Sequence, residues 1–228
     1  DNDEPLRMIG SHADISERHK AVQLEQFRGQ VLDLLAQGLP LPALLRAMVL
    51  RVEALNPGML CSILLLNPET GCLGQGVAPS LPGFYNAAVE GLKIGPGVGS
   101  CGTAAHSGQR VVVNDIQNHP YWTAYRVLAQ QANLAACWSQ PILAASGQVL
   151  GTFAIYHREP HTPTATDIAL IEQCARLVSL AIERRQAEAQ LADSEMRYRS
   201  LIELAREGIV VVQDGRICYC NPMMEEMV

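Results

Sequence analysis

The feature that most constrains the fold is a long stretch without helix-breaking residues near the C-terminal end. No glycine or proline occurs between Pro163 and Gly208, and Thr164 and Asp167 form a capping-box-like pair at the start of this stretch. A continuous helix over residues 164–206 would span about 65 Å, which is longer than a domain of this size is wide. We therefore expect the second half of the helix to leave the core.

This helix carries a seven-residue pattern of apolar side chains. Ile182, Ala189 and Met196 recur every seven residues, whereas several arginines interrupt a strict repeat. The spacing predicts a weak parallel coiled coil, and hence a homodimer formed through the terminal helices. A solvated single helix with charged faces is the alternative.

The composition indicates a globular protein. Hydrophobic residues make up 48% of the 228 residues and charged residues 18%, a balance that supports a buried core. No apolar run approaches the roughly 18 residues needed to cross a bilayer. The net charge of -6, with Lys20 and Lys93 as the only lysines, argues against nucleic acid or a membrane as a partner.

The cysteines show no spacing typical of a disulfide framework. They are Cys61, Cys72, Cys101, Cys137, Cys174, Cys218 and Cys220. An odd number of scattered thiols fits a reducing compartment best, so we expect a cytoplasmic location.

Helix and strand patterns follow one another through the middle of the chain. Apolar residues at helical spacing predict helices over residues 17–37 and 41–55. Apolar runs bounded by turn-forming residues predict strands over residues 59–66, 73–77, 111–116, 135–143 and 148–156. Residues 95–105 form a glycine-rich loop that delivers a helix N-terminus, and another helix is expected over residues 121–131 after Pro120.

Both ends carry strand patterns that lack partners. Residues 7–18 predict a strand that runs into a helix, and residues 209–212 and 217–220 predict a hairpin around Asp214 and Gly215. A single hairpin cannot bury one of its faces alone. We expect both ends to belong to domains whose remainder lies outside this sequence.

Four motifs, taken in order, resemble a bacterial GAF domain. They are GVGSCGTAA at 97–105, VNDI at 113–116, HPYW at 119–122 and ACWSQPI at 136–142. Residues 9–18 resemble the last strand of a PAS domain entering its signalling helix, and residues 194–202, 208–209 and 221–222 resemble the start of another. Strings of this kind resemble the input halves of bacterial signalling proteins that turn over cyclic di-GMP or act as histidine kinases.

The resemblance implies an α+β fold with a six-stranded, mainly antiparallel GAF-like sheet and helices on both faces. Long N- and C-terminal signalling helices would pack on one face, with a ligand pocket on the other. The implied domains are the end of a PAS domain at 1–18, a GAF domain at 19–185, a signalling helix at 186–200 and the start of a second PAS domain at 201–228.

The strongest candidate site is the glycine-rich loop and the helix that follows it. Free backbone amides and the positive end of the helix dipole favour an anion or a carbonyl there. The expected ligand-binding residues are Gly99, Ser100, Cys101, Gly102, Thr103, Ile116, Tyr121, Trp122, Tyr125 and Trp138. The structural alternative is that the glycines only allow a tight connection, that Ser100 caps its own helix and that the aromatic residues pack in the core.

Cys101 invites a chemical interpretation because a thiol near a helix N-terminus has a depressed pKa. It is a candidate redox sensor. The loop also resembles that of free methionine sulfoxide reductases, which are GAF-type enzymes, although Cys137 lies too late in the chain to match their resolving cysteines. Inert buried thiols are the simplest alternative.

Metal and chromophore sites have weaker support. Cys101 and His106 would point about 140° apart on a helix, and Cys218 and Cys220 lack a second ligand pair. Haem ligation by His106, His119 or His157 stays open. The motifs for bilin attachment and for cyclic-nucleotide binding are missing from the sequence, so both ligands are disfavoured, and the sequence requires no cofactor.

We therefore expect a sensory input module that binds a small ligand, with an anion as one candidate, and passes the signal through coiled-coil helices to a downstream output domain of the same chain. The sequence contains none of the catalytic motifs of the usual output domains, so we expect no enzymatic activity from it. The alternatives are a ligand-free dimerisation spacer, whose pocket is filled by Trp138 and tyrosine side chains, and a reductase-like GAF enzyme.

Overall fold

The computed structural model describes residues 29, 31, 33, 34, 36, 38–205, 207–213 and 216–227. The expected PAS strand at 1–18, most of the helix at 17–37 and the turn at 214–215 lie outside the described residues. The chain divides into two compact units, the first ending at Ala181 and the second beginning at Ile182.

A six-stranded sheet forms the first unit. Its strand order is β3-β2-β1-β6-β5-β4, and the neighbouring strands pair antiparallel. The strands are β1 (Leu60–Asn67), β2 (Cys72–Val77), β3 (Leu92–Lys93), β4 (Val111–Val113), β5 (Ala136–Leu143) and β6 (Val149–His157). This confirms the expected α+β class and GAF-like sheet.

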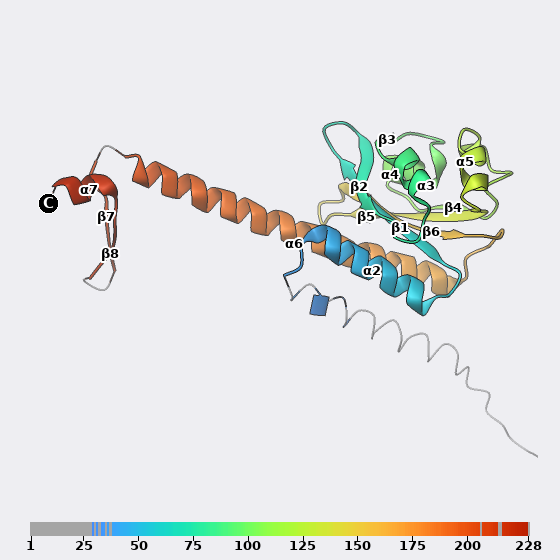
Figure 1. Ribbon diagram of the computed structural model, residues 1–228, viewed down its shortest axis with the longest axis horizontal. Helices are drawn as coiled ribbons and strands as arrows, with labels where there is room; N and C mark the ends of the chain where they lie inside the picture. Colours follow the sequence, from blue (N-terminus) through green and yellow to red (C-terminus); the bar gives the residue numbers. More distant parts are fainter. Residues whose placement is uncertain are drawn as a thin grey trace, which may run out of the picture. The chain divides into compact units, whose positions relative to one another are not determined.

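Helices cover both faces of this sheet. Figure 1 shows α2 (Leu41–Leu55) and the start of α6 (Ala165–Glu203) on one side, with α3 (Gly83–Val89), α4 (Gly99–Ser107) and α5 (Arg126–Gln131) on the other. Helix α2 has the predicted bounds and buries one apolar stripe: Leu44, Leu45, Met48, Val49 and Val52.

The pairing register decides which face each central side chain occupies. Trp138 lies opposite Ile155, and Cys137 lies opposite Tyr156. Successive side chains of a strand point to opposite faces. The sheet face that carries Ile155 is covered by α6, whose Ser179 Oγ donates to the Leu143 carbonyl at 2.6 Å (Figure 1). Tyr156 and Cys137 therefore face α4.

Two predicted elements are shorter than expected because side chains compete for backbone groups. The strand predicted at 111–116 ends at Val113, and Asp115 accepts the Gln117 N–H at 2.9 Å in a turn. The helix predicted at 121–131 is split into the 3₁₀ helix η1 (Pro120–Trp122) and α5, where Thr123 Oγ1 donates to the Pro120 carbonyl at 2.9 Å. Helix α3 and strand β3 were not predicted.

The start of α6 agrees with the sequence. The Thr164 N–H donates to Asp167 Oδ2 at 2.8 Å, and the Asp167 N–H donates to Thr164 Oγ1 at 3.2 Å. The helix ends at Glu203, slightly before the predicted end. Among the described residues, no helix combines the length and apolarity needed to cross a membrane.

The second unit contains a two-stranded sheet of β7 (Val210–Gln213) and β8 (Arg216–Cys220), followed by α7 (Pro222–Met227). Asn221 is fully buried: its Oδ1 accepts from the Ile209 and Met224 N–H groups, and its Nδ2 donates to the Ile202 and Glu207 carbonyls. The hairpin itself exposes the apolar side chains of Val211, Val212 and Ile217.

Candidate functional site

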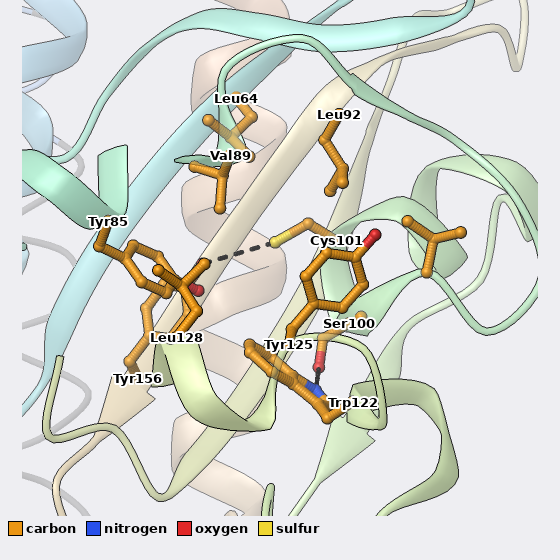
Figure 2. A pocket seen from close by; sticks show the side chains of 12 residues that line it. Leu64, Tyr85, Val89, Leu92, Ser100, Cys101, Trp122, Tyr125, Leu128 and Tyr156 are labelled. Atoms are coloured by element: carbon orange, nitrogen blue, oxygen red, sulfur yellow. Dashed lines mark hydrogen bonds between the residues drawn. The ribbon is translucent and has the colours of Figure 1, made fainter. Parts of the chain in front are cut away.

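A cavity lies between the sheet and the helices on the α4 side and is partly open to solvent; its space, counted together with the solvent at its open mouth, is about 360 Å³. All its lining residues are apolar, aromatic or uncharged polar, and four are aromatic. They are Leu64, Tyr85, Val89, Leu92, Val98, Gly99, Ser100, Cys101, Trp122, Tyr125, Leu128 and Tyr156 (Figure 2). Such a mixture of apolar walls with a few polar points is typical of a small-molecule site.

Glycines bring the start of α4 to the cavity. Gly97 and Gly99 adopt φ values of 75° and 53°, which disfavour residues with a side chain. A Cβ on Gly102 would lie only 2.8 Å from Val98 Cγ1, so the glycine lets Val98 fold against the helix and reach the cavity. The glycine-rich sequence thus shapes both the helix start and one wall.

A hydrogen-bond chain fixes the wall formed by η1. The indole Nε1 of Trp122 donates to Ser100 Oγ at 3.0 Å (Figure 2). Ser100 Oγ in turn donates to the Cys137 carbonyl at 3.2 Å. Ser100 is fully buried inside α4. The alternative that Ser100 caps the helix is therefore wrong, because its hydroxyl links η1 to β5 instead.

The Cys101 thiol contacts the floor of the cavity. Its Sγ lies 3.7 Å from the Tyr156 hydroxyl, which also accepts a hydrogen bond from Ser62 Oγ at 3.4 Å. The pKa of Cys101 is lowered to about 6, chiefly by a hydrogen bond from the Cys137 side chain, although burial opposes this effect. Burial raises the pKa of both Cys137 and Tyr156.

The structure brings half of the predicted site residues together. Gly99, Ser100, Cys101, Trp122 and Tyr125 line the cavity. Cys101 and the two aromatic side chains lie around the same space in Figure 2.

The other predicted residues do not line this cavity. Gly102 packs against Val98, and Thr103 Oγ1 donates to the Gly99 carbonyl at 2.7 Å. Ile116 is buried in the core, while Tyr121 is 37% exposed and lies against the His119 ring. Each of these side chains is occupied by its own packing or hydrogen bonding.

Trp138 was also expected to form a pocket wall, and this is wrong. Its side chain points to the opposite face of the sheet, where Nε1 donates to the His161 carbonyl at 3.4 Å. Its ring packs 4.7 Å from that of His157. Trp138 therefore cannot fill the cavity in the way that the spacer hypothesis requires.

Sequence reasoning missed several lining residues. Tyr85, Val89 and Leu92 belong to the two elements that were not predicted. Leu64 and Tyr156 lie on predicted strands. They could have been assigned to the cavity only if it had been known which side chains of those strands point towards α4.

The histidines considered as haem ligands lie elsewhere. His106 is exposed at the end of α4, His119 packs on Tyr121, and His157 lies on the Trp138 face, stacked 4.3 Å from His161. In the described part of the chain, no group of three or more His, Cys, Asp or Glu side chains could hold a metal ion.

Family comparisons agree with the fold. The GAF domain family matches residues 38–183, and the PAS domain family matches residues 196–228. A curated relative, the methyl sulfide methyltransferase-associated sensor of Methanosarcina acetivorans, is 35% identical over 208 residues, or 91% of this chain. The chain spans 21% of that relative's length.

Solved structures are similar in fold. The free methionine-R-sulfoxide reductase of Neisseria meningitidis, in complex with its substrate, has a TM-score of 0.58 at 19% identity, covering 79% of this chain and 98% of its own. The GAF domain of a phosphoenolpyruvate-protein phosphotransferase from Coxiella burnetii has a TM-score of 0.58 at 21% identity, covering 75% of this chain and 96% of its own. At these identities the likeness supports the fold alone.

Proposed function

The chain belongs to the GAF domain family, and we propose that it is the sensory input of a longer signalling protein and binds a small, uncharged molecule in the cavity beside α4. The observation that carries this proposal is the lining: apolar and aromatic walls around a few uncharged polar groups. The sensor relative in Methanosarcina acetivorans supports a sensory role.

The lining favours an uncharged ligand over the anion considered from the sequence. Moving a full charge out of water is costly unless a counter-charge meets it. Ser100 and Trp122 already bond to each other, so the Cys101 sulfur and the hydroxyl groups of Tyr85, Tyr125 and Tyr156 are the other polar side-chain groups on the lining. A largely apolar molecule with one carbonyl or hydroxyl group fits these points best.

The central strands offer a route for the signal. Along β6, Tyr156 faces the cavity, while Ile155 and His157 face the opposite side, where α6 packs. A ligand that binds one arrangement of this strand more tightly shifts the population of α6 arrangements. We propose that α6 pairs with its copy in a second chain. Light scattering that gives a monomer at tens of micromolar would contradict that pairing.

The downstream output stays a prediction. Turnover of cyclic di-GMP is the reaction expected from the order of domains, and we propose no catalytic turnover by the GAF domain itself. Assaying the full-length protein for cyclic di-GMP synthesis and hydrolysis tests the first expectation.

Ligand binding is tested by thermal unfolding with small uncharged aromatics, indole and 4-methylphenol, and with the charged control benzoate. Saturation at about 100 times the dissociation constant adds roughly 2.7 kcal/mol, or a rise of roughly 5 to 10 °C in Tm. We expect this rise with at least one uncharged probe and none with benzoate.

Two variants on α5 locate the binding. Leu128 lines the cavity, whereas the adjacent Val127 is 68% exposed. Leu128→Trp fills the cavity and should abolish the rise in Tm, and Val127→Trp should keep it. A parent protein that responds to no probe, or a Leu128→Trp protein that responds fully, overturns the proposal.

A further inference from the structure

A ring of hydroxyl groups surrounds a small residue on the floor below α4. Ala154 on β6 lies opposite Ser62 on β1 and opposite Ser139 on β5. Thr152 and Tyr156 stand two residues before and after it, so their side chains point to the same face. All four hydroxyl-bearing side chains are buried. We call Ser62, Ser139, Thr152 and Tyr156 the hydroxyl ring.

Cys101 stands over this ring. Its Sγ lies 3.7 Å from the Tyr156 hydroxyl. Cys137, opposite Tyr156 on β5, adds a thiol on the same face. Because Cys101 also lines the cavity, one side of its sulfur faces hydroxyl groups and the other faces the space in Figure 2.

Two members of the ring are orphans. Ser139 Oγ and Thr152 Oγ1 are fully buried and have no hydrogen-bond partner among the described residues. Buried hydroxyl groups nearly always have one. A neutral thiol is a weak acceptor, whereas a thiolate is a strong one. Both hydroxyl groups lower the pKa of Cys101, after the larger effect of Cys137, so an ionised Cys101 supplies the partner that they lack.

We propose that Cys101 is a nucleophilic thiolate, held by the hydroxyl ring, that captures small uncharged α,β-unsaturated carbonyl compounds entering the cavity. The inference rests on the same cavity as the proposed function. Apart from the Cys101 sulfur, the walls are uncharged and largely apolar and admit this class, and a thiolate is the form of cysteine that reacts with it.

The addition balances without a further reactant. The thiol first loses its proton to solvent. The sulfur lone pair then forms a C–S bond to the β-carbon, and the π electrons of the C=C bond move onto the carbonyl oxygen to give an enolate. A proton from water, or from the Tyr156 hydroxyl with water replacing it, ends on the α-carbon. The product is a thioether. The addition needs no oxidant and no reductant.

The test uses the reduced chain, 2-cyclohexenone as the probe, and peptide mass spectrometry to locate adducts. The exposed Cys218 is an internal reference in the same molecule. At pH 7 we expect Cys101 to react roughly ten-fold faster than Cys218, because the proposed Cys101 thiolate is the nucleophilic form of cysteine. Its rate should rise with a midpoint near pH 6. An unmodified Cys101, a Cys101 rate without a midpoint near pH 6, or a Cys101–Cys137 disulfide in place of the adduct overturns the proposal.

Charge preference is measured with a matched pair of reagents. Iodoacetamide and iodoacetate alkylate thiols by the same substitution but differ in charge. The rate ratio of neutral to anionic reagent should be several-fold higher at Cys101 than at Cys218. An equal ratio at both sites contradicts the preference for uncharged compounds.

Variants separate the ring from general packing. The double change Ser139→Ala and Thr152→Val should raise the Cys101 midpoint by about one pH unit, a shift that a purely structural role would not produce. Ser179→Ala, on α6, removes a different buried hydroxyl and should leave the midpoint unchanged. An unchanged midpoint in the double variant overturns the role of the ring.

The outcomes distinguish this inference from the proposed function. Adduct formation at Cys101 with a low midpoint, combined with no rise in Tm for indole or 4-methylphenol, supports the thiolate site and contradicts reversible sensing. A rise in Tm without adduct formation supports sensing and contradicts the thiolate site.

Discussion

Replacing Ser100 by alanine should destabilise the GAF domain and loosen the wall of its cavity. Ser100 is fully buried, and its hydroxyl accepts from Trp122 Nε1 at 3.0 Å and donates to the Cys137 carbonyl at 3.2 Å. The change removes both bonds, each worth about 1 kcal/mol, and leaves the buried indole N–H without its partner. We therefore expect a loss of about 2 to 3 kcal/mol in the free energy of unfolding.

Urea unfolding measures this loss, with Ser107→Ala as the matched control. Ser107 belongs to the same helix but is exposed, so its replacement should change the free energy of unfolding by less than about 0.5 kcal/mol. Because α6 joins the two units, unfolding should be followed by a probe of the first unit, such as the fluorescence of its tryptophans.

A double-mutant cycle assigns the loss to the predicted contact. Trp122→Phe removes the N–H while keeping a large aromatic ring. If the hydrogen bond to Ser100 carries the energy, the two changes together cost about 1 kcal/mol less than the sum of the single changes. Strict additivity, or a Ser100→Ala cost below about 0.5 kcal/mol, refutes the reasoning.

Two further predictions concern the other parts of the sheet. The pKa of His157 is lowered from 6.5 to about 4, chiefly by burial and then by His161. The unfolded chain therefore binds more protons between these values, and stability should fall by roughly 1 to 2 kcal/mol as the pH drops through this window, after allowance for partial exposure. Urea midpoints at pH 7 and pH 5 should show this loss for the parent and for His106→Gln but not for His157→Gln. A Cβ on Gly151 would lie 2.2 Å from the Leu64 carbonyl oxygen, so Gly151→Ala should cost roughly 3 kcal/mol or more, whereas Gly83→Ala meets no atom within 4 Å and should cost almost nothing in the same assay.

Elements defined by local interactions could be predicted from the sequence. Helix α2 follows from one stripe of apolar residues, and the start of α6 follows from Thr164 and Asp167, which bond to each other within one turn. The prediction of one continuous helix over residues 121–131 was wrong because the Thr123 hydroxyl donates a hydrogen bond to the Pro120 carbonyl. The spacing of apolar residues contains no information on this competition.

The position of Trp138 could not be predicted for a different reason. Strand β5 is covered on both faces, so nearly every residue from Ala136 to Ile142 is buried and the apolar pattern does not alternate. Without alternation, the sequence does not reveal which residues face α4 and which face α6. Only the pairing with β6 places Cys137 towards the cavity and Trp138 away from it.

The hydroxyl ring depends on register even more strongly, because its members come from three strands and meet only around Ala154. Stability does not explain why such a group persists in an apolar core. Alanine or valine at Ser139 and Thr152 would leave no buried donor without a partner and would be at least as stable beside a neutral thiol. The two hydroxyl groups gain a strong acceptor when the Cys101 sulfur carries negative charge, and this links their presence to the proposed chemistry of Cys101.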